Sequence, residues 1–419
     1  MFESYYSIGP RERRSVACLF SFGFGSAASY VLARTIADSA YLSHFGGDHL
    51  ASLFMVSAGV VALSSLIYGR LVQQYALRTV VLSSLLALAI SSLVMPWIMG
   101  HFARSLTVFA FAYLLAQIRG SIGTIQFATI FNELFGHDKP ERVVGLVGAG
   151  ATIAGIVTGL GIGVAADHVN VEALMYLTAG VDLLTMLPII ALPRGGPVSG
   201  EQAVPDLPPP AQPLRFRDAL RNPYVLGITA LVMSSVVVGT LIEFEWKVTA
   251  AEQLDRNEEA LAAYFGYFYG VVDLVTGVTL LLVTSRVLRS RGILVGLLAF
   301  PAGLLVSVLA TWGLSGERLL LWPMTLSKGC DTFKRSLTNP AIQLAYGPLE
   351  HHLRRQAIAF VAGVAKPFAE ALAAIALLTL TPWLSGRQLL AVVICLTAVW
   401  VMLSVTVYRG YAQRQTGTI

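Results

Sequence analysis

The sequence contains little charge. Lys, Arg, Asp and Glu make up 13% of its 419 residues, against roughly 25% in typical soluble domains. Hydrophobic residues make up 55%, and the mean hydropathy is +0.69. A folded chain of this length cannot cover its surface with so few polar groups. The composition therefore excludes an ordinary soluble enzyme, and it excludes a disordered or nucleic-acid-binding chain despite a pI near 9.1.

Cysteines and catalytic or metal-binding motifs are also scarce. Cys18, Cys330 and Cys395 stand singly in apolar stretches, with no CxxC or Cys/His spacing, so we expect small buried residues rather than disulfides or metal ligands. The seven histidines form no HExxH pattern. No P-loop and no Ser/His/Asp set is visible. The sequence thus predicts no enzyme, no ATP-driven pump, no metal and no cofactor.

Long apolar segments are what the chain has in quantity. A helix needs roughly 20 apolar residues to cross a bilayer core. Twelve such windows follow one another: 15–41, 48–69, 77–99, 104–132, 142–166, 171–192, 222–247, 260–284, 292–314, 318–346, 356–383 and 386–408. They predict an all-α integral membrane protein with twelve transmembrane helices. The first window is long and runs into charged residues, so we expect a retained helix rather than a cleaved leader.

A proline-rich stretch divides the windows into six and six. Residues 193–223 hold 8 of the 18 prolines, which argues against one continuous helix and predicts a flexible linker. The expected organisation is a six-helix half at 1–192, a cytoplasmic linker at 193–221 and a second six-helix half at 222–419.

Basic residues lie mostly on one side of this arrangement. With the N-terminus placed inside, the inside segments hold 18 Lys and Arg residues and the outside loops hold 4. This is the positive-inside pattern. It predicts both termini in the cytoplasm, fits a bacterial inner membrane, and indicates contact with an anionic leaflet rather than with nucleic acid.

The two halves resemble each other weakly. FNELFGHDKPER at 131–142 and LAYGPLEHHLRR at 344–355 occupy matching places, and the same offset places Arg34 on Lys247. Two parallel six-helix halves joined by a long inside linker describe a major-facilitator-like architecture.

Ionisable residues inside the windows indicate a functional site. A charge at mid-bilayer costs roughly 2.5–3.5 kcal/mol and needs a partner or a water-filled cavity. Fourteen such residues are present: Arg34, Asp38, Arg119, Asp182, Glu243, Glu245, Lys247, Asp273, Lys328, Asp331, Lys334, Arg335, Lys366 and Glu370. Ten lie in the first, fourth, seventh and tenth windows, which line the cavity of a major-facilitator fold. This placement favours a transporter of a charged solute.

Spacing suggests how these charges pair. Four i,i+4 pairs share a helix face: Arg34/Asp38, Glu243/Lys247, Asp331/Arg335 and Lys366/Glu370. Phosphate or carboxylate groups are ligands for Arg and Lys, and we expect the cations Arg119, Lys328, Lys334 and Arg335 to bind them. Internal ion pairing that joins helices stays open as the alternative.

Some polar and small residues are expected to serve packing alone. Asp182 and Asp273 lie outside the cavity windows, and we expect helix-packing or gate contacts for them. Gly155, Gly159 and Gly163 recur every four residues and predict close helix packing.

Three segments resemble the ATP/ADP translocase (nucleotide transporter) family. TLIEFEWKVTA at 240–250 is similar to that family's helix 7 motif, with Glu243, Trp246 and Lys247 in place. The segment at 326–367 resembles its helix 10–11 region and matches at these positions: Ser327, Lys328, Lys334, Ser336, Leu337, Pro340, Tyr346, Pro348, Leu349 and Lys366. QIRGSIGTIQFATIFNELF at 117–135 is similar to the helix 4 segment.

The resemblance implies a twelve-helix exchanger of nucleotides that binds phosphates with cavity cations. It assigns Glu243, Lys247, Lys328 and Lys334 to the substrate site, and Arg34 by a weaker match. The chain departs from the family where helix 4 has Gln117 and Arg119, and at Ile342-Gln343. It therefore looks like a divergent member.

The resulting hypothesis is a carrier of a small anionic, phosphorylated solute. Its expected substrate-binding residues are Arg34, Gln117, Arg119, Glu243, Lys247, Lys328, Lys334 and Arg335. Its expected coupling or ion-pair residues are Asp38, Glu245, Asp331, Lys366 and Glu370. A proton-coupled carrier of a zwitterionic or lipid-like solute, and a non-transporting membrane scaffold, are the alternatives. Nothing indicates an obligate protein partner.

Overall fold

The computed structural model describes residues 10–102, 104–135, 141–166, 168–192, 221–314 and 319–415. These ranges are helical apart from short turns and contain no strand. Within them, ten helical segments are long and apolar enough to cross a membrane. The predicted all-α membrane fold is confirmed. The predicted linker lies outside the described residues up to 220, as does the loop at 136–140.

Packing contacts divide the chain into two compact units. Unit 1 comprises Met1–Phe45, Val60–Val204 and Arg256–Leu274. Unit 2 comprises Gly46–Gly59, Pro205–Asp255 and Val275–Ile419. Relative to the halves expected from the sequence, the short segment after Phe45 groups with unit 2, and the segment before Val275 groups with unit 1.

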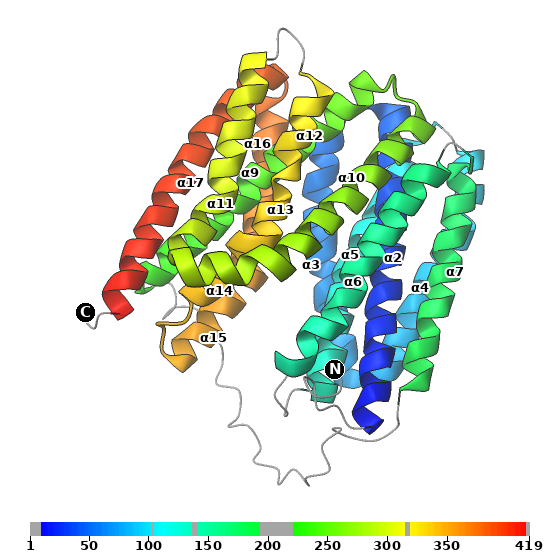
Figure 1. Cartoon of the computed structure of the whole chain (residues 1–419). Helices are drawn as coiled ribbons and strands as arrows, with labels where there is room; N and C mark the ends of the chain where they lie inside the picture. Colours follow the sequence, from blue (N-terminus) through cyan, green and yellow to red (C-terminus); the bar gives the residue numbers. More distant parts are fainter. Residues whose placement is uncertain are drawn as a thin grey trace. The chain divides into compact units, whose positions relative to one another are not determined.

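Unit 1 is a bundle arranged around its first helix. Its helices are α2 (Pro10–Phe45), α4 (Leu77–His101), α5 (Leu106–Phe135), α6 (Glu141–Ala165), α7 (Val171–Ala191), most of α3 (Leu50–Gln74) and most of α10 (Glu258–Thr279). α2 packs against α5, α6 and α7, and α4 packs against α7 (Figure 1). The buried side chains of Leu19, Phe22, Val81 and Val147 form part of the apolar core between these helices.

Glycines bring α6 and α10 into backbone contact within unit 1. A Cβ added to Gly159 would lie 2.5 Å from the Gly270 nitrogen, and one added to Gly266 would lie 2.8 Å from the Gly163 nitrogen. Gly155 faces the carboxyl group of Asp273. Since an added Cβ at these glycines would overlap atoms of the facing helix, the predicted close packing of the glycine series is confirmed. The contact of Asp273 with Gly155 agrees with the helix-packing or gate contact expected for this residue.

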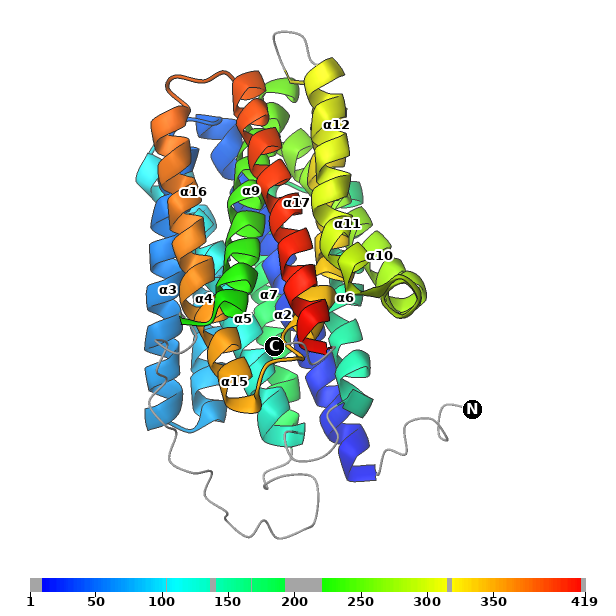
Figure 2. The same ribbon diagram turned by 90° about the vertical axis from the view of Figure 1, so that its left-hand side faces the viewer.

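Unit 2 contains the remaining helices and three π-helical turns. Its elements are α9 (Pro223–Gln253), η1 (Leu280–Thr284), α11 (Ser285–Leu314), α12 (Leu321–Gly329), α13 (Asp331–Phe333), η2 (Lys334–Thr338), α14 (Asn339–Ala345), α15 (His351–Phe360), η3 (Val361–Ala365), α16 (Lys366–Leu380) and α17 (Gly386–Gln415). α9 packs against α12, α16 and α17, and α17 also packs against α11 (Figure 2).

Several of the twelve expected spans differ from simple rods. α10, η1 and α11 form one 57-residue helical segment, which bends at Gly292, where φ is 75° and ψ is −179°. Only glycine adopts this conformation readily. The window 318–346 is broken into α12, α13, η2 and α14. The expectation of one regular helix there is corrected, and the proline that accounts for η2 is described below.

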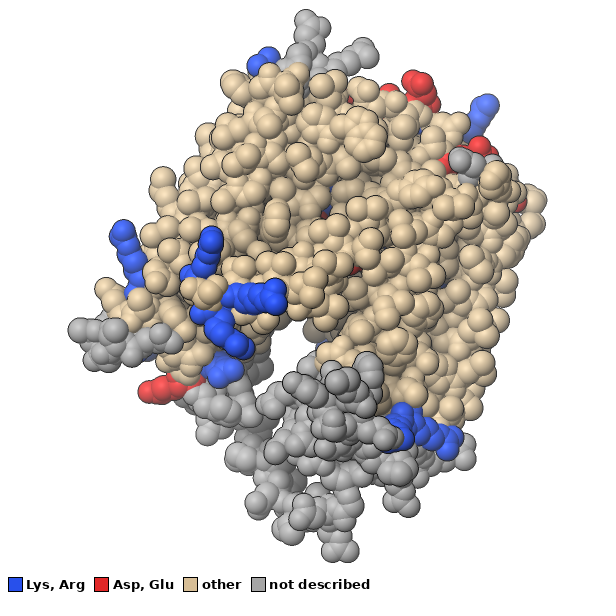
Figure 3. Space-filling model, viewed as in Figure 1, with Lys and Arg blue, Asp and Glu red and all other residues tan. Residues whose placement is uncertain are grey.

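The surface of the helices is that of a membrane protein. Trp383, Leu281 and Trp322 are 85%, 81% and 78% exposed, which would be costly in water but is favourable against lipid. Figure 3 shows charged side chains near helix ends and a broad surface without charge between them. The exposed apolar bands and the ten long helices make this an integral membrane protein.

Candidate functional site

A chain of ion pairs begins on α9. Asn222 caps this helix by accepting a hydrogen bond from the Tyr224 N–H. About six turns later, the i,i+4 spacing brings Lys247 Nζ to 3.1 Å from Glu243 Oε1, as predicted. Lys247 is fully buried, and its ammonium lies 5.3 Å from the ring centroid of Phe54. A buried ammonium needs a carboxylate partner, and Glu243 supplies it.

Lys328 extends the chain from α9 to the broken helix. Its Nζ lies 3.3 Å from Glu243 Oε2 and 2.6 Å from Asp331 Oδ2. Glu243 is therefore shared by two lysines, and Lys328 is shared by two carboxylates. The structure brings together four residues that the sequence predicted for one site.

Proline causes the break that carries the next two cations. In an α-helix the Ser336 carbonyl would accept from the N–H of residue 340, but Pro340 has none. The chain forms a π-turn instead, in which the Asn339 N–H donates to the Lys334 carbonyl five residues back. This wide turn is η2, and Lys334 and Arg335 are its first two residues. Such turns often occur at functional sites.

A second π-turn followed by a proline precedes α16. Pro367 cannot donate to the Gly363 carbonyl, and the Lys366 N–H donates to the Val361 carbonyl, again five residues back. Lys366 follows this turn directly and is exposed. Two prolines thus set the helix geometry next to three candidate cations.

Lys334 lies near several charges of both signs without forming an ion pair in the described ranges. It is half-buried, with its Nζ 5.8 Å from the Phe300 ring centroid. The charges of Asp331, Lys328, Lys366 and Glu243 act on it. Within the described ranges, however, no carboxylate lies within 4 Å of its ammonium. Among the described residues, the Lys334 ammonium thus has no counter-charge in direct contact.

The predicted pair of Lys366 and Glu370 is wrong. Both side chains are exposed, and no ion pair joins them among the described residues. An exposed pair gains little from contact because water screens both charges. The charge of Glu370 nevertheless acts on the cluster, through Lys334, Glu243 and Lys366.

The cluster as a whole carries excess positive charge. We define the cationic cluster as Lys247, Lys328, Lys334, Arg335 and Lys366 together with Glu243, Asp331 and Glu370. Five cations against three carboxylates leave an excess of two positive charges. All eight residues belong to unit 2.

Glu245 lies on another face of α9, away from the chain of ion pairs. It is 6% exposed, and it makes no ion pair with any residue that the structure describes. Its Oε2 packs close to Gly386, where an added Cβ would come within 2.7 Å. Gly386 begins α17, so the carboxylate faces the positive end of a helix dipole.

Arg34 and Asp38 form a separate group in unit 1. Arg34 Nε lies 3.7 Å from Asp38 Oδ2, as the spacing predicted. The guanidinium stacks 4.7 Å from the Tyr269 ring centroid, and the Tyr269 hydroxyl donates to Asp38 Oδ2 at 3.2 Å. The hydroxyl of Tyr30 lies 3.4 Å from Arg34 Nη1. Arg34 is thus already bound on several sides.

Arg119 belongs to a buried network of hydrogen bonds and an ion pair inside unit 1. It is 4% exposed, its Nη1 lies 2.8 Å from Asp182 Oδ2, and it also donates to Ser29, to Ser92 and to the Leu88 carbonyl. Ser29 in turn donates to Asp182. The expectation that Arg119 binds solute is replaced by a packing role, because its donors point at α2, α4 and α7. The packing role predicted for Asp182 is confirmed.

Gln117 and the cysteines complete the predicted residues. Gln117 lies half-buried on α5, two residues from Arg119. The cysteines are free: Cys330 is buried as expected and Cys18 partly so, but Cys395 is exposed on α17, which corrects that expectation. Among the described side chains, no group of three or more His, Cys, Asp and Glu residues could hold a metal ion.

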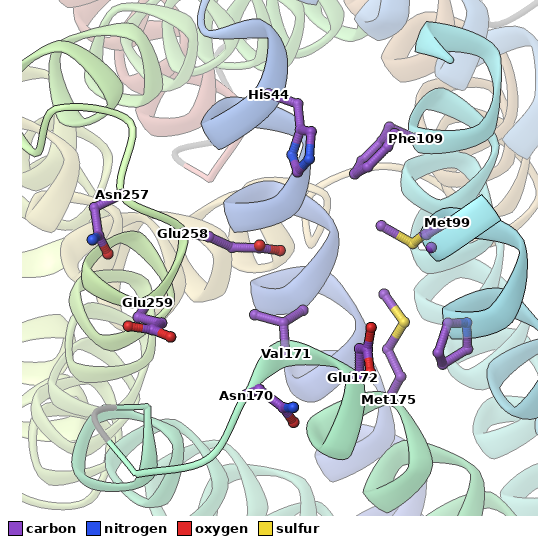
Figure 4. Close-up of a pocket in the computed structure, with 12 residues that line it drawn as sticks. His44, Met99, Phe109, Asn170, Val171, Glu172, Met175, Asn257, Glu258 and Glu259 are labelled. Carbon is purple, nitrogen blue, oxygen red and sulfur yellow. The ribbon is translucent and has the colours of Figure 1, made fainter. Parts of the chain in front are cut away.

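A cavity in unit 1 was not predicted from the sequence. It measures about 530 Å³ and is lined by side chains that include His44, Phe109, Glu172, Glu258 and Glu259 (Figure 4). These residues come from four helices far apart in the sequence, so no local motif marks them. None of the predicted site residues lines this cavity.

Comparisons with known proteins place the chain among transporters. The model of the Major Facilitator Superfamily matches residues 15–345. A mutant of the nucleoside transporter NupG is similar in structure, with a TM-score of 0.68 and 12% identity over 94% of this chain and 100% of that one. A peptide transporter POT in complex with sulfate gives a TM-score of 0.67 and 14% identity over 96% and 95%. No curated protein sequence matches significantly.

Proposed function

Because this chain belongs to the Major Facilitator Superfamily and is a secondary membrane transporter of that fold, we propose that its solute is a small phosphorylated anion, with a nucleotide as the first candidate. We propose transport by alternating access, with both termini in the cytoplasm of a bacterial inner membrane. The 18-to-4 distribution of basic residues supports this orientation.

The observation that carries the proposal is the excess charge of the cationic cluster. Its five cations exceed its three carboxylates by two charges, and a phosphate monoester supplies up to two negative charges at neutral pH. A Lys ammonium binds phosphate as a point charge, and a guanidinium binds it as a two-pronged donor. Lys334, which has no carboxylate within 4 Å in the described ranges, is the expected first contact.

The likeness to nucleotide transporters supports the choice of nucleotide. The α9 segment that resembles the ATP/ADP translocase motif contains Glu243 and Lys247, which form the observed ion pair. The segment of α12 to α14 with the same resemblance contains Lys328 and Lys334. Trp246 of that motif is fully buried, so we assign it to packing rather than to stacking on a base. Arg119 is left out of the proposed site because both of its Nη atoms already bind groups inside unit 1.

The first prediction compares AMP with adenosine, which differ only in the phosphate. Purified protein is expected to show saturable binding and thermal stabilisation with AMP, and proteoliposomes are expected to take up labelled AMP. Because the cluster's excess charge is balanced by phosphate, adenosine should bind at least tenfold more weakly, a difference of about 1.4 kcal/mol. Equal responses to both compounds, or uptake of neither with folded protein, contradict the proposed substrate class.

A second candidate, proton-coupled transport, is favoured by Glu245. A carboxylate that is 6% exposed and has only the α17 helix dipole, and no cationic side chain in the described part of the chain, as its counterpart is costly as an anion. It can instead carry a proton. Such a group could couple solute movement to a proton gradient.

The second prediction tests this coupling. An imposed pH gradient is expected to drive uptake of the solute in wild-type proteoliposomes. Glu245→Gln removes the titrating group but keeps its shape, so it should abolish the gradient effect and leave solute exchange. Glu252→Gln, at an exposed position on the same helix, is the matched control. A gradient effect that survives Glu245→Gln rules out this residue as the proton carrier.

A further inference from the structure

The Ser336 carbonyl is a buried acceptor without its normal helical donor. Ser336 is fully buried in η2, and Pro340 removes the N–H that would have reached its carbonyl. An unsatisfied buried carbonyl costs about 1–3 kcal/mol, so another donor is expected. The side chain of Ser336 does not serve, because its own hydroxyl donates to the Thr332 carbonyl at 2.6 Å.

Thr284 supplies the missing hydrogen bond from a different helix. Its hydroxyl lies 2.7 Å from the Ser336 carbonyl oxygen and 3.1 Å from the Thr279 carbonyl oxygen. One hydroxyl hydrogen serves one acceptor at a time, and the shorter distance favours Ser336. Thr284 itself is 7% exposed and closes the π-turn η1.

A second tether fixes the far end of η2. The Thr338 hydroxyl donates to the Gly296 carbonyl at 2.9 Å, and a Cβ added to Gly296 would lie 2.7 Å from the Cβ of Ala341. The two tethers reach the segment that bends at Gly292 on either side of the bend, at Thr284 and at Gly296. Together they hold the middle and the C-terminal end of the turn that carries the candidate cations.

We propose that Thr284 is a positioning residue for solute binding: its hydroxyl replaces the hydrogen bond that Pro340 removes, and it thereby orients Lys334 and Arg335 toward the anion. This inference rests on the proposed function for the role of the cations, but the tether itself is independent of it. Loss of the hydroxyl frees the Ser336 carbonyl and lets η2 shift, so the two cations lose a common geometry.

The test uses the full chain with AMP as the probe. Thr284→Val keeps the shape and removes the donor, and it should weaken AMP binding about tenfold and speed amide deuterium exchange across 334–342 several-fold. Thr284→Ser keeps the donor and should restore both. Thr397→Val is the matched control, because it removes an equally buried hydroxyl that bonds only within α17. It should change neither.

Pro340→Ala tests whether the effect of Thr284 depends on the hydrogen bond that Pro340 removes. Alanine returns an N–H to position 340 and so gives the Ser336 carbonyl a helical donor. In this background Thr284→Val should change AMP affinity and exchange by less than about twofold. An equal loss in both backgrounds overturns the proposal, as does Thr284→Val with unaltered exchange.

The exchange measurement also separates this proposal from the proposed function. If wild-type protein binds no AMP, the proposed solute fails, while faster exchange in Thr284→Val still supports the tether. If wild-type protein binds AMP and Thr284→Val accelerates exchange without weakening that binding, the solute stands and the positioning role is overturned.

Discussion

Replacing Asp182 with alanine is expected to lower the free energy of unfolding by about 3–5 kcal/mol, because it leaves a buried guanidinium without its counter-charge. Asp182 is 1% exposed and lies 2.8 Å from Arg119 Nη1. Neither group can reach water without opening the bundle of unit 1. Thermal or denaturant unfolding in detergent measures the effect.

The same physics predicts that removing both charges is far less harmful. Replacing a buried ion pair by apolar residues of similar volume is often neutral or stabilising. Asp182→Leu combined with Arg119→Met should therefore recover most of the stability lost in Asp182→Ala. It should also leave AMP binding intact, because neither residue belongs to the cationic cluster. Loss of AMP binding in a stable double variant would return Arg119 to the solute site.

Replacing Lys334 with alanine is expected to produce the largest loss of function. A hydrogen bond to a charged group contributes about 1.5–3 kcal/mol, so AMP affinity should fall about tenfold to a hundredfold. Stability should change little, since within the described ranges Lys334 has no carboxylate partner to leave unpaired. Isothermal titration with AMP and thermal unfolding of the same samples separate the two effects.

Two other lysine variants serve as comparisons for Lys334→Ala. Lys334→Arg keeps the charge and should retain most of the affinity. Lys247→Ala should instead destabilise the fold, because Lys247 is fully buried against Glu243. A non-transporting scaffold makes the opposite prediction for Lys334→Ala, namely loss of stability with no change in anion binding.

The sequence predicts the membrane fold well because each helix that crosses lipid must itself be apolar along its length. Each apolar window is visible without knowing its neighbours, and so are the i,i+4 pairs within one helix, such as Glu243 with Lys247. The family-level reading as a major-facilitator transporter followed from the count, the linker and the charge distribution. All of these are properties of composition along the chain.

Contacts between helices were harder to predict. Arg119 and Asp182 are 63 positions apart, and nothing in either helix alone indicates that they meet. The i,i+4 spacing of Lys366 and Glu370 permits a pair but does not require one in an exposed setting. Pro340 was visible, yet a proline fixes only which donor is missing. The replacement from Thr284 depends on a helix 52 positions away.

The glycine contact between α6 and α10 has a mechanical consequence. Where side chains interlock, one helix can move past another only if side-chain rotamers change. At Gly159, Gly266 and Gly270 an added Cβ would come within 3 Å of backbone atoms of the facing helix, and the Tyr267 ring lies against Gly163. The two helices are therefore at their closest approach, and their spacing is set by backbone rather than by side-chain volume. A larger residue at any of these positions would push α6 and α10 apart and weaken the bundle.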